Sequence, residues 1–275
     1  MSENQISSSL IIGYGLLGAG VLQALRRKKQ QVWATTRSDH KFEDIKESGA
    51  SPLQLDMNIE STWENLLLIG EHWVNIFVLV PPSQIELDSL KKFLSFIRRR
   101  GKSRIILSSS TVVYGTAQRI VTADSEVEIN SKRAERQYAI EQCFKDSIDE
   151  CKIVRLAGLY SKDRVIGRKA ILENRLMEGK GEAWLNLIHI NDAARLLLMA
   201  METGTAGKIE LGSDGAPVRR VKYYTDLANF LSAKTPVFQN QESKKGEGRQ
   251  CDSTVTMTRT GWQPRINDYK KGWLV

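Results

Sequence analysis

Cysteine, proline and long apolar segments are scarce in this chain, and each scarcity excludes a class of protein. There are three cysteines and six prolines among 275 residues. Cys143, Cys151 and Cys251 are odd in number and show no metal-ligand or redox spacing, so we expect reduced thiols in a cytoplasm. No apolar run approaches the roughly 20 residues that span a bilayer. Residues 1–5 also lack the basic and apolar regions of a signal peptide, so we predict a cytoplasmic protein without a membrane partner.

Acidic residues are too few to balance the basic ones. Apolar residues make up 41% and charged residues 26% of the chain, as in ordinary globular proteins, but the net charge is +8. Basic runs occupy residues 26–29, 98–100 and 244–245, and the first two fall where helices should end, where cations complement the helix dipole. No nucleic-acid motif accompanies them. We therefore do not predict a nucleic-acid partner, and an anionic substrate or cofactor accounts for the excess charge more economically.

Short apolar segments alternate with amphipathic ones over the first two thirds of the chain. Expected strands are residues 10–12, 31–35, 53–55, 74–80, 104–107 and 152–156. Expected helices are residues 16–29, 59–69, 84–100 and 132–145. This βαβ order predicts an α/β fold of the Rossmann type, a doubly wound parallel sheet between helices.

The alternation loosens after about residue 160. Helices are expected at residues 165–178, 192–201 and 221–231, strands at 184–190 and 208–211, and a polar surface loop at 239–250. We predict a dinucleotide-binding core over residues 1–160. Residues 161–275 would complete the sheet and form a small substrate-binding lobe.

The first strand runs directly into the glycine pattern Gly13-Tyr14-Gly15-Leu16-Leu17-Gly18. Gly13 permits a tight turn, Gly15 lets the backbone approach a pyrophosphate, and Gly18 lets the helix pack closely on the strand. The positive end of the helix that begins at Leu16 and Leu17 then faces the phosphates. Because the pattern lies between a strand and an amphipathic helix, it predicts a dinucleotide site rather than a structural turn.

The end of the second strand favours NADP over NAD. NAD sites usually carry an acidic residue there, which accepts hydrogen bonds from the ribose hydroxyls. This chain has Thr36, Arg37 and Ser38 instead, with no acid before Asp39. Arg37 can make charge-assisted hydrogen bonds to a 2′-phosphate. The alternative is that Arg37 is an exposed loop cation.

Five motifs occur in a fixed order: the glycine loop, SSSTVVYG at 108–115, VRLAGLY at 154–160, IHIND at 188–192 and TGWQP at 260–264. In these motifs the chain resembles the extended short-chain dehydrogenase/reductases, the group of nucleotide-sugar epimerases and dehydratases. The resemblance covers nearly the whole chain. It also suggests a homodimer, because helices after the fourth and fifth strands pair in many relatives.

The resemblance implies roles for residues outside the glycine loop. Asp56 would contact the adenine ring, and Val80 and Pro81 would line the nicotinamide ribose. Ser110 would stand at the position of the catalytic Ser or Thr and polarise a substrate carbonyl or hydroxyl. Asp56 could equally be a turn residue, and Ser110 the polar end of a strand.

The chain departs from the family at its catalytic pair. No Tyr in the sequence has a Lys four residues after it. In the family these two side chains lie one helical turn apart and reach the same site. Here the Tyr position falls on Ser131, Lys132 or Arg133, and the Lys position on residues 135–137. Tyr114 and Lys132 are the candidate substitutes, with packing or substrate contact as the alternative for Tyr114.

Two further motif residues have both functional and structural interpretations. Arg155 is expected at the carboxyl edge of the sheet, where it would bind substrate or form a salt bridge beneath the site. His189 matches an element that positions the substrate lobe, and we interpret it as a structural residue.

Three functions are consistent with these observations. The leading hypothesis is an NADP-dependent oxidoreductase acting on a small polar or biosynthetic-intermediate substrate. The second is a sensor or assembly partner that binds NADP(H) without turnover. The third is a nucleotide-sugar epimerase or dehydratase, against which the missing Tyr and the short C-terminal lobe both count.

Overall fold

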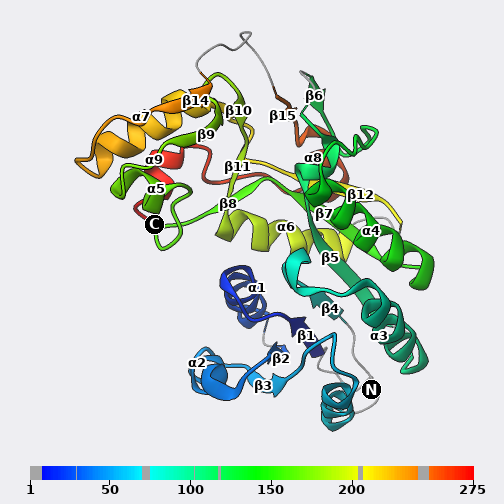
Figure 1. Ribbon diagram of the computed structural model, residues 1–275. Helices are drawn as coiled ribbons and strands as arrows, with labels where there is room; N and C mark the ends of the chain where they lie inside the picture. Colours follow the sequence, from blue (N-terminus) through cyan, green and yellow to red (C-terminus); the bar gives the residue numbers. More distant parts are fainter. Residues whose placement is uncertain are drawn as a thin grey trace.

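A seven-stranded parallel sheet forms the centre of the protein (Figure 1). The computed structural model describes residues 8–28, 30–69, 75–101, 103–116, 119–203, 207–240 and 248–275. The sheet strands are β1 (Ser8–Ile12), β2 (Gln31–Thr36), β3 (Ser51–Gln54), β4 (Asn75–Val78), β5 (Arg104–Ser110), β7 (Lys152–Leu156) and β12 (Ile209–Gly212). Their order is β12-β7-β5-β4-β1-β2-β3, so the predicted Rossmann-type doubly wound fold is confirmed.

The sheet reverses its winding direction at β1. This strand pairs with β2 on one side, Leu10 opposite Trp33, and with β4 on the other, Leu10 opposite Ile76. From β1 the chain continues to β2 and β3 at one edge of the sheet. It then returns to β4, on the other side of β1, and continues toward the opposite edge, which opens a crevice at the carboxyl ends of β1 and β4. In sheets of this kind ligands bind at that point.

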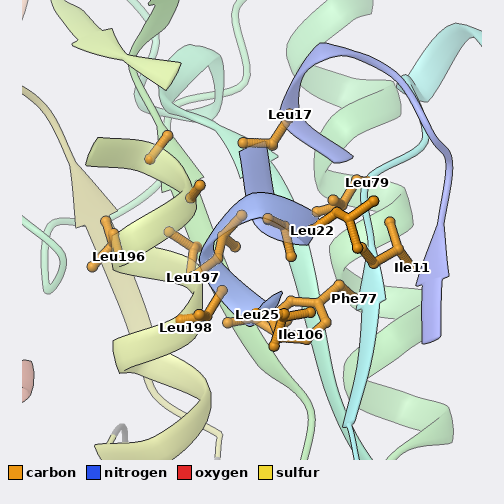
Figure 2. Close-up of a cluster of buried hydrophobic side chains, with 14 of the residues drawn as sticks. Ile11, Leu17, Leu22, Leu25, Phe77, Leu79, Ile106, Leu196, Leu197 and Leu198 are labelled. Carbon is orange, nitrogen blue, oxygen red and sulfur yellow. The ribbon is translucent and has the colours of Figure 1, made fainter. Parts of the chain in front are cut away.

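Helices cover both faces of the sheet because successive strand residues point to opposite sides. On one face, α1 (Leu16–Arg26) and α6 (Ile190–Thr203) pack on Ile11, Phe77 and Ile106. Figure 2 shows the leucines of these two helices meeting over the strands. On the other face, α3 (Leu87–Arg99) and α4 (Lys132–Ser147) cover Leu10, Ile12 and their neighbours.

Residues after Tyr160 contribute to both the sheet and a separate aromatic cluster. The strand β12 and the helices α6 and α8 (Thr254–Thr260) belong to the sheet layers. The smaller lobe contains β9 (Met177–Lys180), β10 (Trp184–Leu185), β13 (Val218–Arg219), β14 (Phe238–Asn240), α5 (Arg168–Leu172), α7 (Arg220–Phe230) and α9 (Tyr269–Gly272). Its core is built around Tyr223, whose ring contacts Tyr224, Tyr269 and Trp273. The division at residue 160 stays a prediction.

Short strands join this lobe to the sheet region. The strand β8 (Gly158–Tyr160) pairs with β11 (Leu187–His189), directly before α6 begins. A second pair consists of β6 (Ile120–Val121) and β15 (Gln250–Cys251). Both pairs bring residues from the second half of the chain to the ends of the central strands.

Several local expectations need correction. The helix expected at 165–178 is wrong, because α5 ends at Leu172 and Asn174 adopts a left-handed φ of 50° before β9 begins. The strand expected at 184–190 is divided between β10 and β11, and residues 59–69 form the 3₁₀ segment η2 (Glu60–Ile69). The first of the residues expected as the strand 74–80, the last of the helix 16–29, and residues 241–247 of the expected loop lie outside the described residues. None of the described helices combines the length and apolar character needed to cross a bilayer.

Candidate cofactor and substrate cleft

A cleft of about 1570 Å³ lies along the carboxyl ends of the central strands. The glycine loop, the ends of β2 and β4, and Ser110 at the end of β5 form one part of its wall. The first turns of α4 and residues from the smaller lobe form the rest. The cleft is therefore at the winding reversal where the topology predicts a ligand.

The glycine loop has the geometry that a pyrophosphate cradle requires. Gly13 has a φ of +101°, which L side chains rarely adopt, and its N–H donates to Thr35 Oγ1 at 3.1 Å. A Cβ on Gly18 would lie 2.6 Å from the Gly13 carbonyl oxygen, so only glycine fits there without a shift. A Cβ on Gly15 would meet nothing within 4 Å. Gly15 thus presents bare backbone to the cleft at the N-terminus of α1, where an anion is stabilised.

Positive charge gathers where β2 ends. Thr36, Arg37 and Ser38 all line the cleft, and the following short η1 (Asp39–Lys41) adds His40 and Lys41. Ser38 Oγ and His40 Nδ1 are 2.6 Å apart, which fixes the turn. Asp39 is exposed and does not line the cleft.

The residues expected around the adenine and the nicotinamide ribose lie in the cleft wall. Asp56, Val80 and Pro81 line it together with Leu16 and Leu17. Asp56 also has a local structural task, because Oδ1 accepts the Asn58 N–H at 2.9 Å and its carbonyl accepts the Trp63 indole N–H at 3.1 Å. Both interpretations of Asp56 are compatible with its place in the structure.

Ser110 and Tyr114 have different surroundings although they are four residues apart. Ser110 lines the cleft at the end of β5, and its hydroxyl oxygen accepts the Val112 N–H at 3.3 Å. Tyr114 ends the 3₁₀ turn η4 (Thr111–Tyr114), is fully buried and does not line the cleft. Burial raises the pKa of its hydroxyl, although the Arg155 guanidinium lowers it. A catalytic role for Tyr114 stays a prediction, and its position favours the packing alternative.

The first turns of α4 present Lys132, Arg133, Arg136 and Gln137 to the cleft. Arg133 and Gln137 are four residues apart, as are Lys132 and Arg136, so each pair has the spacing of the family's Tyr and Lys. Arg136 is already engaged, since it donates to the carbonyls of Pro82 at 2.9 Å and Ile85 at 2.6 Å. Cations and an amide therefore occupy the part of α4 at which the resemblance predicts the family's acid–base pair.

Arg155 lies beneath this site and outside the cleft lining. Its guanidinium donates to both carboxylate oxygens of Glu141, at 3.0 and 2.6 Å, and its exposed fraction is 1%. The same carboxylate accepts the Ser109 hydroxyl at 2.5 Å. The structure thus has the salt bridge that was one of the two interpretations of Arg155, and substrate binding by this residue stays a prediction.

His189 and Asp192 also face away from the cleft. His189 is 1% exposed, and its Nε2 lies 3.3 Å from the Val275 carbonyl oxygen. The Asp192 carboxylate accepts the backbone N–H groups of Arg265 and Ile266 at 2.9 and 2.8 Å. The motif at 188–192 therefore holds the C-terminal segment that follows the motif at 260–264.

Sequence reasoning missed the basic residues that the second half of the chain adds to the cleft. Arg164, Lys180 and Arg249 line it, together with Trp184. These residues come from separate loops and strands, and no local spacing signals their convergence. Among the described residues, Asp56 is the one carboxylate in the lining, against eight Lys and Arg side chains.

Comparison with known proteins agrees with this arrangement. The sequence profile of the NAD dependent epimerase/dehydratase family matches residues 84–212. The protein YeeZ of Escherichia coli strain K12 is 26% identical over 274 residues, with 94% of this chain and 96% of YeeZ covered.

Two solved structures illustrate the shared fold. A functionally unknown conserved protein from Silicibacter pomeroyi has 19% identity and a TM-score of 0.79, with 98% of this chain and 97% of that chain covered. The UDP-glucuronic acid 4-epimerase of Bacillus cereus, solved with UDP-glucuronic acid and NAD, has 17% identity and a TM-score of 0.78, with 97% of this chain and 96% of that chain covered. The chain is thus similar to the NAD dependent epimerase/dehydratase family over residues 84–212, and it shares the fold of these solved structures over nearly its whole length.

Proposed function

We propose that the chain is an NADP-dependent oxidoreductase that acts on a small polar substrate. The observation that carries this proposal is the charge at the end of β2. Arg37 and Lys41 line the cleft there, and no carboxylate of residues 35–41 does so. A ribose 2′-phosphate would offset these cations, whereas a free 2′-hydroxyl gains most from an acidic partner.

The glycine loop fits the rest of such a cofactor. The opening at Gly15 and the close contact between Gly13 and Gly18 leave room for a pyrophosphate against the backbone N–H groups. Arg37, Ser38 and Lys41 would hold the 2′-phosphate, and Val80 and Pro81 the nicotinamide ribose. When bound, NADPH would supply hydride to a carbonyl carbon near Ser110.

Ser110 and Lys132 are the residues of this chain placed to assist that reduction. The Ser110 hydroxyl accepts one hydrogen bond from Val112 and keeps its own O–H free to donate to the carbonyl oxygen. As the C=O bond becomes a C–O single bond, that oxygen takes up a proton from water or from Lys132. Orientation contributes much of the rate of hydride transfer, so the step does not require the family's tyrosine.

Calorimetric titration of NADPH and NADH into the wild type, Arg37→Ala and Arg27→Ala tests the proposal. Arg27 is an exposed cation at the end of α1 that does not line the cleft, so it controls for net charge. Loss of a charge-assisted hydrogen bond corresponds to about 1.5–3 kcal/mol. We expect that loss for NADPH with Arg37→Ala, and unchanged NADH affinity. Equal affinity of the wild type for both nucleotides would contradict NADP preference, and binding of neither would end the enzyme hypothesis.

The second candidate function is NADP(H) binding without turnover. It is favoured by the burial of Tyr114 and by the presence of Arg133 and Gln137 on the α4 face. Oxidation of NADPH across a panel of aldehydes and ketones separates the two functions. Oxidation that Ser110→Ala slows supports the oxidoreductase. Tight binding without oxidation of NADPH supports the sensor.

A further inference from the structure

The substrate half of the cleft contains basic side chains that the cofactor proposal does not use. Arg133 reaches it from the first turn of α4, Arg164 from the loop after β8, and Arg249 from the position directly before β15. Three segments distant in sequence therefore direct cations to one space. Among the described residues, the sole carboxylate in the lining is Asp56 at the adenosine end, so none of these cations has an acidic neighbour in the cleft wall.

These cations differ from the basic residues that serve the fold. Arg136 is satisfied by two carbonyl oxygens and lies 3.6 Å from the Glu86 carboxylate. Within the described parts of the chain, the guanidinium groups of Arg133 and Arg164 form no ion pair and no side-chain hydrogen bond with other residues. Their charge is available to a ligand.

Arg249 is held in place from several sides. The neighbouring backbone is fixed because Asn186 donates to the Arg249 carbonyl at 2.9 Å and accepts the Cys251 N–H at 2.7 Å. The guanidinium donates from Nη1 to the Gly115 carbonyl, while Nε is buried without a hydrogen-bond partner among the described residues. A cation fixed by its backbone loses little conformational freedom when it binds an anion.

Arg133 and Arg249 both line the cleft, and Arg249 donates to Gly115, whose neighbour Thr116 accepts a hydrogen bond from Asn130 just before α4 begins. Burial lowers the pKa of the Arg249 guanidinium, and the positive charge of Arg133 lowers it further. Two like charges that face a space without carboxylates repel each other, and an anion between them would reverse that cost. Such an arrangement is typical of sites that bind carboxylate or phosphate groups.

We propose that Arg133 and Arg249, with Arg164 at the rim, form a binding site for an oxyanion of the substrate. Arg133 is one of the three positions, with Ser131 and Lys132, at which the resemblance would place the family's tyrosine, so a cation would hold a substrate anion close to where that tyrosine would donate a proton. The substrate class is then a small acid, a carboxylate or a phosphate ester that also bears the reducible carbonyl. This inference rests on the proposed function, because it assumes that the cofactor occupies the other half of the cleft.

The test measures binding of inorganic phosphate and of malonate to the full chain saturated with NADPH, by calorimetry. Phosphate and malonate distinguish the two oxyanion classes. The variants are Arg133→Gln, Arg249→Gln and the control Arg98→Gln, an exposed arginine in the last turn of α3 that does not line the cleft. Arg133→Lys is added because it keeps the charge. Arg249→Gln is accepted only if its circular dichroism and thermal unfolding match the wild type, since Arg249 contacts backbone.

We expect one of the two anions to bind the NADPH complex and to lose at least about tenfold affinity in Arg133→Gln, the scale of one charge-assisted hydrogen bond. Arg133→Lys should recover part of that loss, and Arg98→Gln should match the wild type. Anion binding that NADPH abolishes would overturn the proposal, because the anion would then occupy the cofactor's phosphate positions. An equal loss in Arg98→Gln would also overturn it. If NADPH itself fails to bind, the proposed function falls, and the same variants titrated without cofactor still decide the oxyanion site.

Discussion

The guanidinium of Arg155 on β7 donates two hydrogen bonds to the carboxylate of Glu141 on α4, and both side chains are buried. Glu141 also accepts the hydroxyl of Ser109, so one carboxylate joins the helix to two neighbouring strands. Ser109 directly precedes Ser110 in β5, so the pair ties α4 to the strand that carries Ser110. The cleft face of α4 therefore depends on a charge pair that does not itself line the cleft.

Removal of one partner of this pair should destabilise the protein strongly. In Arg155→Met the Glu141 carboxylate would remain buried without its cation, which costs about 3–5 kcal/mol in comparable sites. The double variant Arg155→Met/Glu141→Leu should recover much of that loss, because no uncompensated charge remains. Urea unfolding measures both. Arg175→Met serves as a control, since its partner Glu173 is exposed and such pairs contribute about 0–1 kcal/mol. A double variant that is less stable than Arg155→Met would contradict this account.

Gly15 and Gly18 should respond differently to the same substitution. A Cβ on Gly18 would lie 2.6 Å from the Gly13 carbonyl oxygen, so Gly18→Ala should lower the free energy of unfolding by about 1–3 kcal/mol. Gly15→Ala meets no protein atom within 4 Å, so we expect a stability change below about 1 kcal/mol. The methyl group added by Gly15→Ala would instead occupy space needed by the pyrophosphate, and NADPH affinity should fall. Thermal unfolding and calorimetry separate the two effects, and unchanged NADPH affinity in Gly15→Ala would argue against a pyrophosphate at this position.

Asp192 belongs to the motif at 188–192, and we expect it to contribute to the stability of the fold rather than to the chemistry of the cleft. Its carboxylate accepts two backbone N–H groups near the C-terminus and pairs with Arg195 at 2.6 Å. Asp192→Ala removes the partner of two partly buried backbone N–H groups and of Arg195, at a total cost of about 1–3 kcal/mol. Asp268→Ala is the matched control, because it removes a single cap at the start of the short α9 and should cost about 1 kcal/mol. Similar unfolding midpoints for the two variants would show that the Asp192 contacts contribute little.

The sequence predicted those parts of the site that depend on local geometry. Gly13, Gly15 and Gly18 follow from the turn between one strand and one helix, and the parallel sheet follows from the alternation of strands with helices. Arg164 and Arg249 could not be predicted in the same way, because they reach the cleft through the pairings of β8 with β11 and of β15 with β6. For Tyr114 the sequence left a catalytic role and packing as alternatives, and it could not choose between them. The 3₁₀ turn after Ser110 directs it into the core, and a turn of this kind has no clear sequence signal.

The helix expected at residues 165–178 shows the limit of periodicity. Its apolar spacing is helical, but Gly167 and Asn174 both adopt left-handed φ angles, of 81° and 50°. The intervening α5 is consequently five residues long, and Met177 begins a strand that pairs with β14. Tertiary pairing of an edge strand decided this segment, and propensity alone did not reveal it.

The buried carboxyl of Asp214 should make stability depend on pH. Burial raises its pKa, hydrogen bonds from backbone N–H groups lower it and the Asp192 charge raises it, so the pKa increases overall from 3.8 to about 7. Between about pH 4 and pH 7 the folded protein then keeps a proton that the unfolded chain has lost. The contribution of Asp214 to stability is therefore greatest below pH 4 and declines as pH rises to 7, by roughly 1.4 kcal/mol for each unit of the pKa difference. In Asp214→Asn this decline should be absent, so the variant should gain stability relative to the wild type as pH rises.

Asp226 supplies a control of opposite sign. Although burial raises its pKa, hydrogen bonds from Tyr269, Lys222 and Lys270 lower it overall, so Asp226 stabilises the fold above the pKa of an unfolded aspartate and loses that effect on acidification. Asp226→Asn should thus lower the free energy of unfolding, relative to the wild type, more at neutral pH than at acidic pH. Asp214→Asn should show the reverse. Urea unfolding at about pH 3, 4.5, 6 and 8 measures both differences, because the Asp226 effect is lost below the pKa of about 3.9 of an unfolded aspartate and the Asp214 effect changes between about pH 4 and pH 7. If the two differences change with pH in the same direction, the titration of Asp214 is not what sets this dependence, and its carboxyl must reach water in the folded protein.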